Sequence, residues 1–216
     1  MTPATASTVD HPFFARIWPV IAAHETEVVR ALRRENLAGL SGRVLEIGAG
    51  TGTNFAFYSD SVEQVVAIEP EPRLAVRARD AAADAAIPVH VTNETVEDFT
   101  PAEPFDAVVC SLVLCSISDP DAVLRQLFWR LRPGGELRYF EHVASSGIRG
   151  RLQQFVDATF WPRLLGNCHT HRDTERSIVA AGFEFDGARR ERTLPAWVPL
   201  PVSEFALGRA RRPRVG

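Results

Sequence analysis

An apolar segment that leads into alternating glycines constrains the fold of this chain more than any other feature of the sequence. The segment VLEIGAGTGTNF occupies residues 44–55, and the strand that it predicts spans 43–47. Glycines at the end of a strand let the backbone turn sharply and let a ligand approach it closely. We expect a helix after this turn, whose free N–H groups would favour a carboxylate or a phosphate.

Strand and helix patterns then alternate along the chain. The predicted strands span residues 43–47, 65–68, 88–92, 105–114 and 136–143, with predicted helices at 71–86 and 118–132 between them. Such alternation is typical of a parallel sheet with helices on both faces. The sequence therefore predicts a doubly wound α/β fold.

The two ends of the chain have different patterns. Residues 12–40 place apolar side chains near helical spacing and are expected to form a helical cap that is interrupted at Pro19. Towards the other end, helices are predicted at 150–165 and 173–181, and two further strands near 183–193 and 202–209. The length of the chain suits one large domain better than two, so we treat residues 1–216 as a single domain.

The ionisable residues exclude several kinds of protein. All 24 basic residues are arginine, so a lysine Schiff base and a standard P-loop are both excluded. A net charge of −3 argues against a nucleic-acid partner. The sparse cysteines, Cys110, Cys115 and Cys168, are typical of reduced thiols in a cytoplasmic protein, and no apolar run is long enough to span a membrane.

Polar residues at the ends of the predicted strands indicate which ligand the glycine turn suits. The dinucleotide fingerprint GxGxxG needs a glycine where this chain has Thr53, and an acid, Glu46, stands two residues before the first glycine. Glu69 ends the second predicted strand, where a carboxylate can accept hydrogen bonds from both hydroxyls of a ribose. The alternative for Glu69 is a solvated acid at a strand end.

These features together resemble the class I S-adenosylmethionine-dependent methyltransferases. The resemblance covers about residues 40–143 and rests on ExGxGxG, Glu69, the acid after the third strand and LRPGG before the fifth. It implies a Rossmann-like sheet of seven mostly parallel strands whose last strand is antiparallel. With the predicted cap and a helical insertion after strand five, this is the fold that we expect.

The resemblance also implies a cofactor, S-adenosyl-L-methionine, with S-adenosyl-L-homocysteine as its product. The three glycines would shape the site of the cofactor's methionine, Glu69 would bind the ribose, and Glu94 with Thr95 would meet the adenine. The positions assigned to the cofactor are Glu46, Gly48, Gly50, Gly52, Asn54, Glu69, Pro70, Glu94, Thr95 and Leu112. In the cap, Arg16 is a candidate to pair with the cofactor's carboxylate. The cofactor-binding core is then residues 41–143, between the tail and cap (1–40) and the acceptor-site helices and last strands (144–216).

The second half of the chain shows a narrower resemblance, to the methyltransferase-like 7 group. It rests on SLVLCSI (111–117), EHV (141–143), Asp157 with Trp161, and GNCHTHRDT (166–174), where GNC replaces the commoner GGC. The group comprises thiol methyltransferases of animal cells and bacterial relatives, some of them described as phospholipid or quinone methyltransferases. Its animal members carry an N-terminal membrane anchor that is not expected here, so we expect at most a peripheral membrane contact.

Few residues are candidates for a general base. A thiol with a pKa of about 8.5 is already partly ionised, whereas a hydroxyl acceptor needs a base. His142, after strand five, and Asp157, on a helix that could cover the cleft, are the candidate catalytic residues. The alternative for His142 is a structural histidine bonded to the backbone, and the alternative for Asp157 is an acid on the helix surface or in an ion pair.

The acceptor is expected to be an apolar small molecule. Its candidate contacts are Phe14, Trp18, Cys115, Trp161, His169 and Arg172. A buried structural thiol is the alternative for Cys115, and an ordinary core position is the alternative for each aromatic residue. A metal site at Cys168, His169 and His171 is not expected, because a fourth ligand at a recognisable spacing is missing.

The sequence therefore favours an S-adenosylmethionine-dependent methyltransferase of the cytoplasm that methylates an apolar small molecule, with a thiol preferred. Alternatives within this class are O-, N- or C-methylation of a phenol, quinone, natural product or phospholipid. Alternatives of another class are a nicotinamide oxidoreductase, which Thr53 disfavours, and a protein that binds the cofactor without catalysis.

Overall fold

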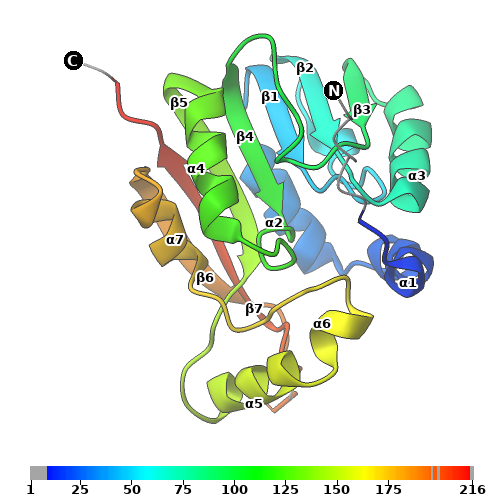
Figure 1. Ribbon diagram of the computed structural model, residues 1–216, viewed down its shortest axis with the longest axis vertical. Coiled ribbons are helices and arrows are strands. Elements are labelled where there is room, and N and C mark those ends of the chain that lie inside the picture. Colours follow the sequence, from blue (N-terminus) through cyan, green and yellow to red (C-terminus); the bar gives the residue numbers. More distant parts are fainter. Residues whose placement is uncertain (1–8, 196, 199, 215–216) are drawn as a thin grey trace, which may run out of the picture.

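A seven-stranded sheet forms the centre of the molecule (Figure 1). The computed structural model describes residues 9–195, 197–198 and 200–214. The strands are β1 (Gly42–Ile47), β2 (Val62–Ile68), β3 (Val89–Thr92), β4 (Phe105–Ser111), β5 (Leu131–His142), β6 (Glu184–Arg192) and β7 (Glu204–Arg211), in the order β3-β2-β1-β4-β5-β7-β6. β7 runs antiparallel to both of its neighbours, β5 and β6, and the other four strand pairs are parallel. The predicted doubly wound, mostly parallel sheet is confirmed.

Helices cover both faces of this sheet. On one face, α2 (Glu27–Leu37) packs against β5 and β7 and α3 (Pro72–Ala83) against β3, and both helices share a core with Val44 of β1. On the other face, α4 (Pro120–Arg130) and α7 (Thr174–Ala180) share a core with Leu45. Neighbouring residues of a strand point to opposite faces, so both side chains are buried. This explains why the central strands are continuous apolar runs rather than alternating ones.

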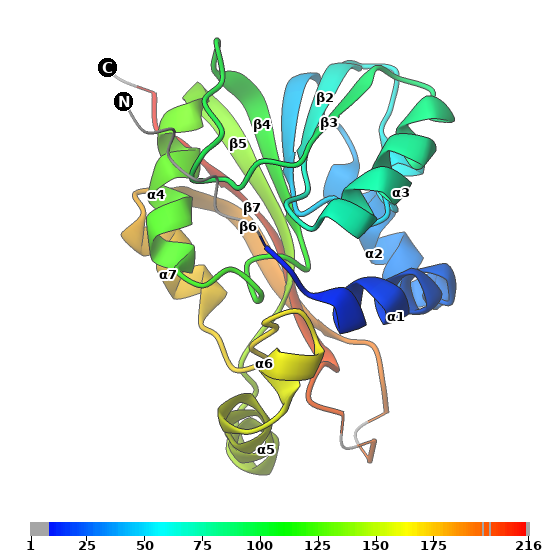
Figure 2. The ribbon, with the colours of Figure 1, turned by 45° about the vertical axis from the view of Figure 1, so that its right-hand side comes forward.

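The helical cap and the insertion lie together at one end of the sheet. Figures 1 and 2 show α1 (Pro12–Ala23), α5 (Gly147–Ala158) and α6 (Trp161–Leu164) at the end to which the arrow of β4 points. Strand order reverses between β1 and β4, because the chain runs outward from β1 to β3 and then returns to β4. Such a reversal opens a crevice at the carboxyl ends of the strands, where folds of this kind bind ligands.

The cap breaks at a different place from the one predicted. Pro19 lies inside α1, and the chain leaves the helix only after Ala23. Thr26 then caps α2, since its hydroxyl accepts a hydrogen bond from the N–H of Val29 at 3.4 Å. The prediction of an interruption at Pro19 is therefore wrong, and the capping residue Thr26 sets the boundary.

The α-helix predicted directly after the glycine turn is also wrong. Residues 51–54 form turns, and the only helical element between β1 and β2, where every residue is described, is a short 3₁₀ helix, η1 (Phe55–Phe57). The N–H of Phe55 donates to the carbonyl of Gly52 and that of Phe57 to Asn54, both of them i to i+3 bonds. The turn therefore presents no α-helix N-terminus to a ligand within residues 48–61, all of which the structure describes.

Other predicted elements differ mainly at their ends. Strand β4 ends at Ser111 instead of 114, and β5 starts at Leu131 instead of 136. The helix predicted at 150–165 is divided into α5 and α6, with a break at residues 159–160. None of the helices in the described part of the chain is both long and apolar enough to cross a membrane.

Candidate active site

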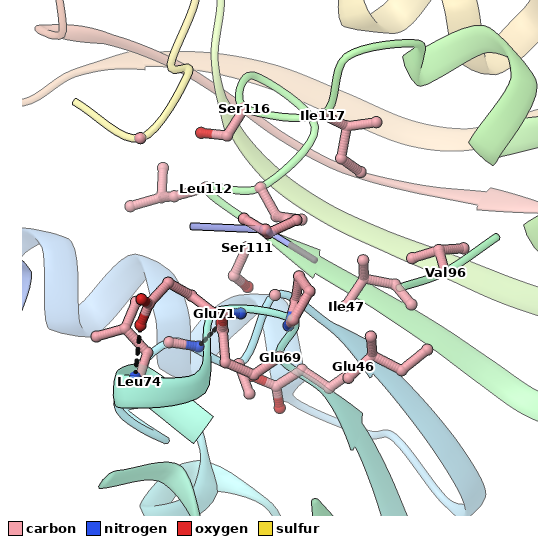
Figure 3. Close-up of a pocket in the computed structure, with 18 of the residues that line it drawn as sticks. Glu46, Ile47, Glu69, Glu71, Leu74, Val96, Ser111, Leu112, Ser116 and Ile117 are labelled. Atoms are coloured by element: carbon pink, nitrogen blue, oxygen red, sulfur yellow. Dashed lines mark hydrogen bonds between the residues drawn. The ribbon is translucent and has the colours of Figure 1, made fainter. Parts of the chain in front are cut away.

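A pocket of about 440 Å³ opens where the strand order reverses (Figure 3). Its walls come from the ends of β1, β2 and β4, the loop after β3, and helices α1 and α2. Predicted site residues that line it are Phe14, Trp18, Glu46, Gly48, Gly50, Asn54, Glu69, Pro70, Thr95 and Leu112. The pocket thus combines the residues expected for the cofactor with two aromatic residues expected for the acceptor.

The glycine turn forms the floor of this pocket. Gly50 has a φ of +59°, in the left-handed region that favours glycine. A Cβ atom at Gly50 would lie 2.8 Å from Nε1 of Trp18, so the indole rests against bare backbone. Gly52 serves the turn differently, since a Cβ there would collide with Phe55 and Ala81 outside the pocket.

Glu69 stands at the end of β2 with its side chain in the pocket wall, next to Glu71 in Figure 3. It is 5% exposed, and its carboxylate accepts hydrogen bonds from the N–H groups of Gly50 at 2.7 Å and Glu71 at 3.0 Å. Burial raises the pKa of Glu69 to about 7, although these two hydrogen bonds oppose the shift. Each carboxylate oxygen has a further lone pair, so the group can still accept hydroxyl hydrogens from a ligand.

Glu46 is the second buried acid of the pocket. Its carboxylate accepts hydrogen bonds from Nδ2 of Asn54 at 3.0 Å and from the hydroxyl of Tyr58 at 2.6 Å. Burial is the largest effect on this group and raises the pKa of Glu46 to about 7. The Oδ1 atom of Asn54 in turn accepts from Arg33 at 3.1 Å. These bonds connect β1 and the glycine turn to α2.

Arg33 is a pocket residue that the sequence reasoning missed. Its guanidinium is buried, pairs with both carboxylate oxygens of Glu25, and lines the pocket. Arg16 is exposed and outside the lining, while Arg172 donates to the carbonyl oxygens of Leu114 and Ile117. Among the residues that the structure describes, Arg33 is the arginine that reaches the pocket.

A sequence signal for Arg33 was nevertheless present. It stands at helical spacing between Val29 and Leu37, within the apolar stripe of α2. Leu37 is fully buried, and Val29 packs against a neighbouring buried cluster. A charged residue in such a stripe needs a partner or a ligand, and this would have marked Arg33 as a candidate.

The loop after β3 places its acids differently from the expectation. Thr95, Val96 and Glu97 line the pocket. Glu94 is exposed, lies outside the lining and accepts a hydrogen bond from the hydroxyl of Thr92 at 2.7 Å. Thr95 therefore reaches the pocket as predicted, whereas the carboxylate of Glu94 bonds to Thr92.

Helix α1 and the loop after α6 close the side of the pocket where Phe14 and Trp18, the predicted acceptor contacts, lie. The rings of Phe14 and Trp18 stack with centroids 5.4 Å apart, and a Cβ at Gly166 would lie 2.7 Å from Phe14. The amide of Asn167 donates to the carbonyl of Ser116 at 2.8 Å. Figure 2 shows this arrangement, with α1 next to α6 across the end of the sheet.

Asp157 holds a loop in place. Its Oδ1 accepts hydrogen bonds from the N–H and the hydroxyl of Thr170, at 2.8 and 3.0 Å, and its Oδ2 accepts from the N–H of His171 at 2.9 Å. Asp157, Trp161 and His169 all lie outside the pocket lining. Their catalytic and acceptor roles stay predictions.

Glu141 is a second residue that the sequence reasoning did not assign. It is fully buried at the end of β5, and burial raises its pKa. Its carboxylate accepts hydrogen bonds from the N–H groups of Val113, Leu114 and Cys115, at 2.9, 3.0 and 3.3 Å. Glu141 thus fixes the loop after β4, which forms one wall of the pocket.

His142 lies behind this wall with two cysteines. Its Nδ1 atom is 3.8 Å from Sγ of Cys115 and 3.9 Å from Sγ of Cys168, and the two sulfur atoms are 3.7 Å apart. Both thiols are buried and unpaired by disulfides. The neighbouring Cys168 thiol, together with burial, raises the pKa of Cys115 well above its usual range. None of the three lines the pocket, so the catalytic role of His142 also stays a prediction.

Comparison with known proteins adds the family. The methyltransferase domain family matches residues 21–184 of the chain. The thiol S-methyltransferase TMT1B of Mus musculus is 31% identical over 215 residues, which cover 92% of this chain and 85% of the relative. The N-methyltransferase NodS of Bradyrhizobium japonicum WM9, in complex with S-adenosyl-L-homocysteine, superposes with a TM-score of 0.65 at 19% identity and covers 87% of each chain. The [4+2]-cyclase SpnF superposes with a TM-score of 0.68 at 18% identity and covers 98% of this chain and 100% of its own.

The two solved structures show a shared fold and no more, since proteins named for different reactions superpose about equally well. The family match carries the assignment, because it spans the glycine turn, Glu69 and the loops that close the pocket. The resemblance to class I enzymes seen in the sequence is thereby confirmed. The chain belongs to the methyltransferase domain family and is an S-adenosylmethionine-dependent methyltransferase of class I.

Proposed function

We propose that the protein transfers the methyl group of S-adenosylmethionine to the sulfur of an apolar small-molecule thiol. The observation that carries this proposal is the 31% identity with the thiol S-methyltransferase TMT1B of Mus musculus, which extends over 92% of the chain. An identity of this extent reaches beyond the cofactor-binding core into α5, α6 and the loop after α6, whose Gly166 and Asn167 line the pocket. No comparable argument favours an oxygen, nitrogen or carbon acceptor.

The residues of the pocket fit the cofactor. We assign the ribose hydroxyls to Glu69, because its buried carboxylate keeps free lone pairs beside the glycine turn. We assign Glu46 to the amino group of the cofactor's methionine and Arg33 to its carboxylate, since each offers the opposite charge. Gly48 and Gly50 border the pocket with bare backbone, against which Val113 and Trp18 pack, and Thr95 borders the expected adenine site.

The acceptor end suits a thiol attached to an apolar body. The cofactor supplies an electrophilic methyl group on a sulfonium centre. The protein's task is then to bind the acceptor with its sulfur in line and to keep water out. Phe14, Trp18 and Leu112 provide apolar walls. A thiolate needs no general base at the moment of transfer, so the proposal requires none from His142 or Asp157.

A panel of matched acceptors tests the proposed function. Thiophenol against phenol, and an alkyl thiol against the alcohol of the same carbon skeleton, differ only in the nucleophilic atom. We expect methylation of the thiols, measured by mass spectrometry of the products with S-adenosylmethionine as donor. Methylation of phenols, quinols or amines, with the thiols untouched, would contradict the proposal.

A melting-temperature rise with S-adenosylhomocysteine but not with NADH would separate this protein from a nicotinamide oxidoreductase.

The raised pKa of Glu69 predicts that cofactor affinity depends on pH. With a pKa of about 7, the carboxyl is mostly protonated at pH 6 and mostly ionised at pH 8. Only the ionised form can accept a hydrogen bond at every oxygen lone pair. The titration of Glu69 alone should therefore lower the affinity for S-adenosylhomocysteine about tenfold from pH 8 to pH 6, measured by isothermal titration calorimetry, and Glu46, whose pKa is also about 7, should add to this fall. Equal or tighter binding at pH 6 would argue against Glu69 as the ribose acceptor.

We further propose that the protein acts in the cytoplasm and contacts lipid only peripherally. At the end of the molecule that carries α1, α5 and α6, the exposed apolar side chains include Phe13 of α1 and Ile148 and Phe155 of α5. Such side chains suit a transient contact with a lipid surface from which an apolar acceptor could be taken. Co-sedimentation with phosphatidylcholine vesicles measures this contact, and complete recovery in the supernatant would contradict it.

A further inference from the structure

Cys115, Cys168 and His142 form a compact cluster of soft ligand atoms beside the pocket. Cys115 lies in the loop after β4, His142 ends β5, and Cys168 lies in the loop after α6. The three segments are far apart in the sequence, yet one ligand atom from each lies within 4.8 Å of the others. Thiolate and imidazole together are the ligands that zinc prefers in proteins.

The spacing of the three ligand atoms matches a tetrahedral zinc ion. With Zn–S and Zn–N bonds of about 2.3 and 2.05 Å, tetrahedral angles place two sulfur ligands about 3.8 Å apart, and a sulfur and a nitrogen about 3.6 Å apart. The observed separations are 3.7 Å between the sulfur atoms of Cys115 and Cys168, and 3.8 and 3.9 Å from these atoms to Nδ1 of His142. One ion could therefore bind all three atoms with shifts of a few tenths of an ångström.

The surrounding hydrogen bonds hold the ligand-bearing segments in this arrangement. Glu141 accepts from the N–H of Cys115 at 3.3 Å, and the carbonyl of Cys115 accepts from the N–H of His169 at 2.8 Å. The N–H of Cys168 donates to the carbonyl of Leu165 at 3.1 Å. A site whose ligands are fixed before the ion binds loses less conformational entropy on binding.

We propose that Cys115, Cys168 and His142 bind a thiophilic metal ion, with zinc as the ion that the geometry fits. On binding, two thiols lose their protons to solvent and form two Zn–S bonds, while His142 donates its lone pair from Nδ1. The ion would join three segments that hydrogen bonds already connect. In this role His142 is a metal ligand and not a general base. Among the described residues no fourth His, Cys, Asp or Glu side chain joins the group, so the fourth tetrahedral position is open to water or another ligand.

The position of the cluster connects it to the acceptor side of the pocket. Ser116 follows Cys115 and Asn167 precedes Cys168, and both of these neighbours line the pocket. The amide of Asn167 donates to the carbonyl of Ser116 at 2.8 Å, so the two loops meet at the wall. An ion between Cys115 and Cys168 would hold that wall closed.

Zinc titration of the full chain tests the site independently of methyl transfer. The protein is reduced with a phosphine, stripped with a chelator and titrated with ZnCl₂ against a chromophoric chelator. We expect one zinc ion per chain, and binding roughly 100-fold or more weaker in Cys168→Ser, because a thiolate ligand is lost. Cys110→Ser is the matched control, since Cys110 is buried on β4 outside the cluster, and it should bind zinc as the wild type does.

Two further measurements keep the test decisive if Cys168→Ser does not fold. With CoCl₂ the wild-type protein should show the visible bands of a tetrahedral ion and a thiolate-to-cobalt charge-transfer band. His142→Ala should weaken zinc binding, and His142→Cys should restore it. Absence of stoichiometric binding in the reduced wild type, or unchanged binding in a folded Cys168→Ser, would overturn the proposal. The proposal would also be overturned if the purified protein contained a Cys115–Cys168 disulfide and bound no zinc after that disulfide was reduced.

Discussion

Glu69→Gln is expected to weaken the binding of S-adenosylhomocysteine by about 100-fold. The carboxylate lines the pocket and already accepts the N–H groups of Gly50 and Glu71. An amide keeps one acceptor oxygen but turns an NH₂ group towards the other N–H, so the glycine turn and the ribose compete for the remaining oxygen. Hydrogen bonds to a charged group contribute about 1.5–3 kcal/mol each, so weakening two of them costs about 3 kcal/mol.

Calorimetry on two variants separates this effect from a general loss of structure. Glu63→Gln is the matched control, because Glu63 is on the same strand and exposed, and it should bind S-adenosylhomocysteine as the wild type does. Circular dichroism should show both variants folded. Glu69→Gln should also bind with less dependence on pH between 6 and 8, since one of the two pocket carboxyls with a pKa of about 7, Glu69 and Glu46, is gone. A folded Glu69→Gln with wild-type affinity would remove Glu69 from the cofactor site.

The parts of the fold that sequence could predict depend on local patterns. Strand β1 was predicted because its apolar run is followed at once by glycines, which stop it. The start of β5 was predicted five residues late, because Pro133 and the glycines after it read as a turn. In the structure Leu131 still pairs with Phe105, and the register then shifts across the turn residues. Long-range pairing thus extended the strand through residues that favour a turn.

The parts of the site that sequence missed depend on contacts between distant segments. Arg33 reaches Asn54, and Glu141 holds the N–H groups of residues 113–115. Cys115 and Cys168 are 53 positions apart and meet only when the loops after β4 and α6 fold together. In the glycine turn, by contrast, the spacing of the acid and the glycines can be seen within one short segment, so the pocket residues of this turn were predictable. No pattern within a single segment marks a pair of side chains that the tertiary fold brings together.

Gln153→Leu is expected to lower the free energy of unfolding by about 4 kcal/mol, the largest effect that we predict for a residue outside the pocket. Gln153 is fully buried on α5, and its Nε2 lies 2.9–3.1 Å from the carbonyl oxygens of Val143, Thr170 and Pro201. Its Oε1 accepts the N–H of Ser145 at 2.7 Å. Leucine fills a similar volume, so the loss comes from buried backbone groups without partners, at about 1–3 kcal/mol each.

Urea unfolding followed by circular dichroism measures this loss, with Gln154→Leu as the control. Gln154 is the next residue on α5 and is exposed, so its replacement should change the free energy of unfolding by less than about 0.5 kcal/mol. A loss below about 1 kcal/mol in Gln153→Leu would mean that water replaces the missing amide. The segments that Gln153 joins carry His142 one residue and Cys168 two residues from their contact points. A large loss of unfolding free energy would therefore show that the buried amide of Gln153 holds together the segments behind the pocket wall that carry His142 and Cys168.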